Sequence, residues 1–286
     1  MRLLCALLWL CIVFVAFFFV GFETNVPPAM DFEVRESKIL VGVFTIASHY
    51  EQRMLLRAHY HRHHSSVGEE QNAAVVVMFV ISGQSRARVM REQAEHGDML
   101  EVDCAENTNE GKTFYYFKAA LERFPGYVYY VKADDDTVIH VGRLFWLLMT
   151  FAGKEDYVGK TNENKDFWPQ RYWEKMSFYR YRVMGWLLTS FSFAYGPVYA
   201  LSGRAVQRWV QLDPPKKKLV LYGDEDVLTG YYIHGVLGMQ PKHVENIYYE
   251  YEEVGLWNGT FSRHTVVAVH HCRRADQIKE VSSLLL

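Results

Sequence analysis

Apolar and polar positions along the chain form short apolar runs separated by amphipathic stretches. The runs are rich in β-branched and aromatic residues and are bounded by turn formers such as Gly126, which is typical of buried strands. Where apolar residues recur at helical spacing, as at Phe114, Phe117 and Leu121, the pattern indicates a helix. The predicted elements are strands at Ile39–Ile46, Ala73–Ile81 and Tyr127–Val131, and helices at Glu51–His64, Arg86–His96 and Thr113–Phe124.

This β-α-β-α-β order predicts an α/β fold with a Rossmann-like, mostly parallel sheet. The second half of the chain is less regular. Strands are predicted at Tyr195–Ser202 and Thr265–His270, and a loop at Asp213–Asp224. In open sheets of this class, ligands bind beyond the carboxyl ends of the strands, so we expect a site at that edge.

The N-terminus carries an uninterrupted apolar stretch, Leu3–Phe22, of 20 residues. At about 1.5 Å per residue it is long enough for the roughly 30 Å hydrocarbon core of a bilayer. Bulky residues continue to its end, which favours an uncleaved signal anchor over a cleaved signal peptide. We expect three parts: a cytoplasmic tip and anchor at 1–22, a short stem at 23–37, and a lumenal domain at 38–286.

Composition narrows the function further. The chain has 31 basic and 33 acidic residues, and its basic run, Lys216–Lys218, is typical of a solvated loop. This balance argues against a nucleic-acid interface. Aromatic residues make up 15% of the chain; most belong in the core, and some are suited to stacking on sugar rings.

Three adjacent carboxylates, Asp134, Asp135 and Asp136, follow the predicted strand at Tyr127–Val131. Their mutual repulsion is relieved by a hard divalent cation such as Mg²⁺ or Mn²⁺, which binds oxygen ligands and is shared with a substrate phosphate. A metal bound to a diphosphate is therefore the first hypothesis. The alternative is a solvated acidic turn or a helix N-cap.

Two other clusters stand at predicted element ends. Asp224, Glu225 and Asp226 precede a helix-forming stretch, where they are either a capping cluster or the source of a catalytic base. His270 and His271 end an apolar strand. An imidazole at that position either completes a metal shell or is an ordinary exposed histidine.

Other polar features are less specific. The histidine-rich segment His59–His64 lacks a carboxylate or cysteine at ligand spacing, so a role without metal is favoured over a zinc site. Outside the apolar N-terminal stretch, the cysteines are Cys104 and Cys272, which are either paired or free. Asn258 begins an N-glycosylation sequon, which is usable if the segment is lumenal and exposed.

Six segments carry a resemblance in chain order. They are Arg53–Tyr60, Phe79–Gly83, Glu95–Thr113, Lys132–Asp136, Tyr195–Ser202 and Glu225–Gly230. These segments are similar, in turn, to RxxxRxTW, an FLLG strand end, a GDI-to-KT region, KTDDD, YPxYxxGxGYVLS and EDVYVG. The chain thereby resembles the β-1,3-glycosyltransferases of glycosyltransferase family 31, which include galactosyl-, N-acetylglucosaminyl- and Fringe-type enzymes.

The resemblance implies a GT-A fold, a UDP-sugar donor carrying galactose or N-acetylglucosamine, and a Mn²⁺ or Mg²⁺ cofactor. It also implies inversion at the anomeric carbon, transfer in β-1,3 linkage, and a glycan acceptor on a glycoprotein or glycolipid. Residence in the Golgi membrane as a single-pass type II protein follows from the same resemblance.

The resemblance also assigns roles to residues. Asp226 matches the catalytic base, and Asp136 and His270 match the metal ligands, with His271 as the neighbouring alternative. Asp134 and Asp135 would contact the nucleotide ribose, or the metal through water. The other donor-binding residues implied are Arg53, Arg57 and Lys132.

The chain departs from the family pattern at several positions. His59 and Tyr60 replace the Thr and Trp of RxTW, Asn109–Gly111 stands where NLT is usual, and the Gly-x-Gly before YVLS is missing. These departures keep open a catalytically inactive, membrane-tethered glycan-binding or chaperone-like homologue. A metal-dependent phosphohydrolase is a further alternative, because such enzymes also use clustered aspartates.

Overall fold

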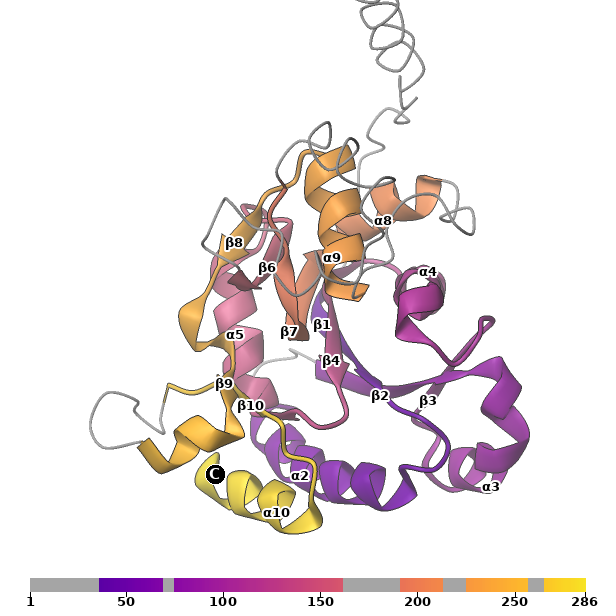
Figure 1. The fold of residues 1–286 in the computed structure, drawn as a ribbon, viewed down its shortest axis with the longest axis vertical. Helices are drawn as coiled ribbons and strands as arrows, with labels where there is room; N and C mark the ends of the chain where they lie inside the picture. The colour runs from indigo at the N-terminus through magenta and orange to yellow at the C-terminus, as the bar shows by residue number, and fades with distance from the viewer. Residues whose placement is uncertain (1–35, 69–74, 162–190, 213–224, 257–264) are drawn as a thin grey trace, which may run out of the picture.

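Seven strands form the central sheet of the protein, in the order β3-β2-β1-β4-β7-β6-β8 (Figure 1). The computed structural model describes residues 36–68, 75–161, 191–212, 225–256 and 265–286. The strands are β1 Glu36–Phe44, β2 Val75–Ser82, β3 Met99–Val102, β4 Tyr127–Asp134, β6 Tyr157–Thr161, β7 Ala194–Ser202 and β8 Pro241–His243.

The sheet is mostly parallel, as the order of predicted elements indicated. Strand β1 pairs in parallel with β2 and β4, β2 with β3, and β6 with β8. Only β7 runs against its two neighbours in this sheet, β4 and β6. The parallel half brings the carboxyl ends of β1 and β4 to the same edge, where Phe44 is in register with Asp134.

A second, three-stranded sheet lies beyond that edge. Its strands are β5 Val138–Ile139, β9 Tyr249–Glu250 and β10 Ala268–His270, in the order β5-β10-β9. Strand β10 pairs antiparallel with β5 and parallel with β9. Because β5 begins four residues after the end of β4, this small sheet holds a C-terminal segment beside the acidic turn that follows β4.

Helices cover both faces of the central sheet (Figure 1). One core cluster contains buried residues of α2, α5 and α10, and the other contains buried residues of α4 and α8. The helices are α2 Tyr50–Gly68, α3 Arg86–His96, α4 Lys112–Arg123, α5 Val141–Phe151, α8 Gly203–Gln211, α9 Glu225–Gly230 and α10 Ala275–Leu284. Shorter turns are η1 Gly83–Ser85, η2 Thr108–Glu110, η3 Tyr231–Val236, η4 Glu245–Ile247 and η5 Tyr251–Leu256.

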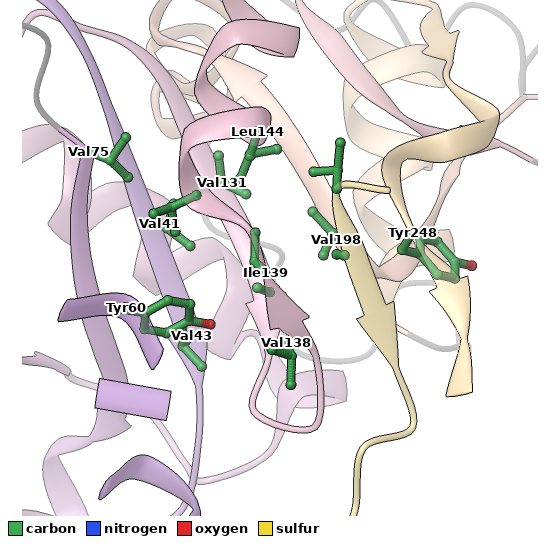
Figure 2. Close-up of a cluster of buried hydrophobic side chains, with 14 of the residues drawn as sticks. Val41, Val43, Tyr60, Val75, Val131, Val138, Ile139, Leu144, Val198 and Tyr248 are labelled. Atoms are coloured by element: carbon green, nitrogen blue, oxygen red, sulfur yellow. The ribbon is translucent and has the colours of Figure 1, made fainter. Parts of the chain in front are cut away.

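The first core cluster joins the two sheets (Figure 2). Val41 of β1, Val131 of β4 and Val198 of β7 come from the central sheet, and Ile139 of β5 comes from the small one. Leu144 of α5 closes the cluster. All five side chains are fully buried, so hydrophobic packing fixes the small sheet against the central one.

The predicted elements of the first half are confirmed, with shifts of a few residues at their ends. The predicted strand at Thr265–His270 is shorter in the structure, since β10 is Ala268–His270. Of the two alternatives for Cys104 and Cys272, the structure has free thiols. Cys104 follows β3 at one edge of the central sheet, whereas Cys272 follows β10 in the small sheet.

Several predictions lie outside the described residues. These are the anchor at Leu3–Phe22, nearly all of the stem, the loop at Asp213–Asp224, Asp224 itself and the sequon at Asn258. Within the described parts of the chain, no helix has both the length and the apolar character needed to cross a membrane.

Gly42 in β1 offers a test of the core packing. A Cβ atom there would lie 2.2 Å from Cε2 of Tyr116. The side chain of Tyr116 is fully buried, and its hydroxyl group donates a 2.7 Å hydrogen bond to the carbonyl of Val131. Gly42→Ala is therefore expected to lower the free energy of unfolding by about 1–3 kcal/mol through overpacking. Denaturant unfolding measures this change. Gly83→Ala, where the nearest atom lies at 3.5 Å, is the control, and equal midpoints for the two variants would contradict the packing described.

Candidate functional site

The acidic segment after β4 forms a tight turn. The backbone N–H of Thr137 donates to the carbonyl of Asp134 at 3.1 Å, and the chain then returns as β5. The N–H of Cys272 donates to the carbonyl of Asp136 at 2.8 Å. These bonds hold the turn against the segment that follows β10, which is why residues far apart in sequence meet here.

Asp134, Asp136 and His270 form a group of potential metal ligands, with one ligand atom from each lying within 4.8 Å of the others. Nε2 of His270 is 3.3 Å from Oδ1 of Asp136. Two carboxylates and one imidazole suit Mn²⁺ or Mg²⁺, which favour oxygen ligands. The residues present therefore fit the divalent cation that the family resemblance implies.

Asp135 contacts residues other than those of the Asp134, Asp136 and His270 group. Its carboxylate contacts Nδ1 of His49 at 2.8 Å, and its carbonyl accepts from Nε2 of Gln52 at 3.1 Å. Burial raises the pKa of Asp135, although hydrogen bonds from Thr45 and His49 oppose this. The side chain thus faces the loop between β1 and α2. His49 was missed by the sequence analysis, and its place just after a strand is the one signal that points to it.

His270 contacts a carboxylate on each side of its ring. Its Nδ1 lies 2.9 Å from Oε2 of Glu250, its register partner in β9, while Nε2 faces Asp136. Burial lowers the pKa of His270, but Asp136 and Glu250 outweigh it and raise the pKa to about 9. The same contacts hold the pKa values of Asp136 and Glu250 below their usual values, against the opposing effect of burial. Below about pH 9 the protonated imidazole of His270 therefore lies between the carboxylates of Asp136 and Glu250.

Lys132 links the acidic turn to α9. Its buried ammonium contacts Asp134 at 2.7 Å, the carbonyl of Gly196 at 2.7 Å and Glu225 at 3.1 Å. Burial lowers the pKa of Lys132, but Asp134 and Glu225 raise it above its usual value. The hydroxyl of Tyr199 donates to the other oxygen of Glu225 at 2.6 Å. An ammonium has three protons, and these three contacts use them within the protein.

Asp226 stands in the first turn of α9, next to this network. Its Oδ2 accepts from the N–H of Gly196 at 3.0 Å, and its Oδ1 accepts from the N–H of Val227 at 2.8 Å. A Cβ atom added to Gly196 would lie 3.5 Å from Nζ of Lys132 and 3.7 Å from Oδ2 of Asp226. Asp226 is therefore joined to Asp134 through Gly196 and Lys132.

Two tyrosines, Tyr248 and Tyr195, lie within electrostatic range of Asp226, and Tyr248 also contacts His270. Tyr248 packs edge-on against the ring of His270, with 6.0 Å between ring centroids. Burial raises the pKa of Tyr248, and the charges of Glu250 and Asp226 raise it further. Burial and Asp226 also raise the pKa of Tyr195.

Arg53 and Arg57 lie behind the site, in a buried ion-pair network. Arg53 makes a two-pronged contact with Glu92, at 2.8 and 2.7 Å, and its remaining donors reach Thr45 and the carbonyls of residues 46 and 47. Arg57 pairs with Glu92 and Asp98, each at 2.7 Å. Direct contact of either arginine, or of Lys132, with a donor stays a prediction. In the structure, all three support surrounding segments.

The structure brings together most of the residues singled out from the sequence. Asp134, Asp136 and His270 form one group, and Lys132 connects it to Asp226. The sequence analysis missed three contributors that come from separate elements: His49, Tyr248 and Glu250. Of the histidine-rich segment, His59 is buried with Nε2 2.9 Å from the carbonyl of Ile139, so it has a structural role.

A mostly parallel α/β sheet with carboxylates and a histidine beyond its strand ends defines a class of proteins that bind ligands at that edge. Residues 51–245 match the family described as galactosyltransferase, and this match covers more than half of the chain. The protein belongs to the galactosyltransferase family.

Individual relatives are consistent with this family. The chain is 30% identical over 189 residues to the probable beta-1,3-galactosyltransferase 13 of Arabidopsis thaliana. The aligned region covers 63% of this chain and 51% of the relative. It is 24% identical over 175 residues to the beta-1,3-galactosyltransferase pvg3 of Schizosaccharomyces pombe. Here the aligned region covers 43% of this chain and 46% of the relative. The chain thus spans about half the length of the curated relatives it matches.

Solved structures also align with the chain. The galactosyltransferase LgtC in complex with donor and acceptor sugar analogues covers 86% of this chain and 95% of its own, at 14% identity and a TM-score of 0.46. Mouse xyloside xylosyltransferase 1 covers 84% of this chain and 97% of its own, at 12% identity and a TM-score of 0.41.

The charge of His270 should make the stability of the metal-free protein depend on pH. Its pKa is raised from 6.5 to about 9 on folding, so its stabilising contribution is complete below about pH 6.5 and is lost as the pH rises through about 9. We expect the difference in free energy of unfolding between the native protein and His270→Gln to shrink over that range. Denaturant unfolding with a chelator measures it. A difference that does not change with pH would contradict the ion contacts of His270.

Proposed function

We propose that the protein is an inverting, metal-dependent glycosyltransferase that moves galactose from UDP-galactose to a hydroxyl group of a glycan acceptor, in β-1,3 linkage. The observation that carries this proposal is the linked site: Asp134, Asp136 and His270 on one side, and Asp226 on the other, joined through Lys132. Membership of the galactosyltransferase family supports the reaction type, and the names of the relatives support galactose and the linkage. UDP-N-acetylglucosamine is the competing donor.

The acidic group is suited to hold a Mn²⁺ or Mg²⁺ ion through Asp136, His270 and, directly or through water, Asp134. When bound, such an ion neutralises negative charge on a departing diphosphate. The protein holds these ligand side chains in position. The hydrogen bond between Asp136 and the segment after β10 fixes the turn, and Glu250 holds the ring of His270 in line with Asp136.

Asp226 is suited to act as the base. Two backbone N–H groups, from Gly196 and Val227, hold its carboxylate in one orientation. A carboxylate that is ionised and oriented can accept the proton of an acceptor hydroxyl as the hydroxyl oxygen attacks the anomeric carbon. A single displacement of this kind needs one base and inverts the anomeric centre.

The setting of the reaction is also part of the proposal. The apolar stretch at Leu3–Phe22 supports a signal anchor, with the catalytic domain in the lumen of the Golgi and the acceptor on a glycoprotein or glycolipid. Charge balance over the whole chain argues against nucleic acid as a partner.

Donor hydrolysis tests the function without knowledge of the acceptor. We expect the full chain in detergent to hydrolyse UDP-galactose faster than UDP-N-acetylglucosamine, with Mn²⁺ present and not with EDTA. Asp136→Ala should abolish the hydrolysis and the Mn²⁺-dependent affinity for UDP, because the diphosphate charge is then left uncompensated. Glu122→Gln, which changes an exposed carboxylate of α4, is the control. Unchanged Mn²⁺-dependent UDP affinity in Asp136→Ala would overturn the metal assignment.

Asp226→Asn separates a base from a binding residue. The change keeps the size of the side chain but removes its basicity, so turnover should fall by roughly 10²–10⁴-fold while UDP affinity changes little. Transfer kinetics and calorimetry measure the two quantities. Asp224→Asn is the matched comparison two residues away. Near-normal transfer by Asp226→Asn, or loss of transfer only in Asp224→Asn, would move the base away from Asp226.

A further inference from the structure

A second group of potential metal ligands lies beside the one described above. It consists of Glu250, His270 and His271, with one ligand atom from each within 4.8 Å of the others. Oε2 of Glu250 is 2.9 Å from Nδ1 of His270 and 2.9 Å from Nδ1 of His271. Ligand bonds of about 2 Å in tetrahedral geometry would put donor atoms roughly 3.3 Å apart. A metal ion would therefore need only small side-chain shifts here.

The backbone accounts for how two successive histidines reach one carboxylate. Successive side chains of a regular strand point to opposite faces. His271, however, has a φ of 63°, in the left-handed region that non-glycine residues seldom adopt. This conformation directs its ring to the side of His270, and the two ring centroids are 3.9 Å apart. Such a conformation costs free energy and is found at functional sites more often than elsewhere.

The ligand types of the two groups differ. The group of Asp134, Asp136 and His270 has two oxygen ligands and one nitrogen ligand, whereas this second group has two imidazoles and one carboxylate. Imidazole favours zinc and related transition metals, and three protein ligands with a fourth position for water are common for zinc. Glu250 and His271 are 34% and 35% exposed, so an ion can reach them from solvent.

We propose that Glu250, His270 and His271 form a second metal site, which takes zinc or a similar nitrogen-preferring ion, and that zinc bound there excludes Mn²⁺ from the neighbouring group. The zinc site stands independently of the catalytic activity. The exclusion rests on the metal assignment made for the proposed function.

The exclusion follows from the sharing of His270. A neutral imidazole has one N–H and one lone pair. Nε2 faces Asp136 and Nδ1 faces Glu250. With zinc on Nδ1, the remaining proton of the ring resides on Nε2 and is donated to Asp136, so that nitrogen has no lone pair for a second ion. With Mn²⁺ on Nε2, the proton resides on Nδ1 and is donated to Glu250.

Calorimetric titration of Zn²⁺ into the metal-free full chain tests the site without any sugar donor. We expect one zinc site in the native protein, and its affinity should fall at least about tenfold in His271→Ala and in Glu250→Gln, since even the loss of an outer partner of a metal ligand has an effect of that size. Glu252→Gln, an exposed neighbour of Glu250, is the matched control. Circular dichroism confirms that each variant is folded. Unchanged zinc affinity in a folded His271→Ala variant would overturn the proposal.

Two further titrations separate the sites. Asp136→Asn should retain zinc binding while losing Mn²⁺ binding, and zinc should lower the apparent Mn²⁺ affinity of the native protein but not that of His271→Ala. Loss of Mn²⁺ affinity in His271→Ala would assign both histidines to one site and contradict the division proposed here. Failure of the proposed function would appear instead as absent donor hydrolysis with the zinc titration intact.

Discussion

The site depends on the contacts that the buried ammonium of Lys132 makes with its three partners. Carboxylates from β4 and α9 meet at one edge of the sheet, and this cation holds Asp134, Glu225 and the carbonyl of Gly196 together. Removing one partner of a buried ion pair typically costs about 3–5 kcal/mol, because the other charge is left without compensation. Lys132 therefore fixes the distance between the acidic turn and the segment that carries Asp226.

His270 provides a second positive charge beside the carboxylates of the site, and this charge depends on the protonation of its ring. Its contacts with Asp136 and Glu250 raise its pKa and keep both carboxylates ionised. In the proposed function, a divalent cation at the acidic group would replace the positive charge of the protonated ring beside the turn after β4. The small sheet keeps these charged groups close together, because it joins β5, which follows the turn, to the strands that carry His270 and Glu250.

Buried arginines support the opposite side of the turn. Arg53 bonds to Glu92 and to the backbone of residues 46 and 47, and the same loop presents His49 to Asp135. The loop after β1 is thus held by charge-assisted hydrogen bonds beneath it. The ends of β1 and β4 are kept in place by ion pairs in the protein interior, whereas Asp134, Asp136 and His270 are only half-buried.

The sequence by itself determined the α/β class, the strand that ends in Asp134–Asp136 and the position of Asp226 at a helix start, because these depend on local periodicity and on strand and helix ends. Only the tertiary structure decided that Asp134, rather than Asp135, joins Asp136 and His270. The same holds for Glu250, whose part depends on the pairing of β9 with β10. Asp136 and His270 lie more than a hundred residues apart in the chain, and Glu250 and His270 lie 20 residues apart. No local pattern encodes the packing that brings these segments together.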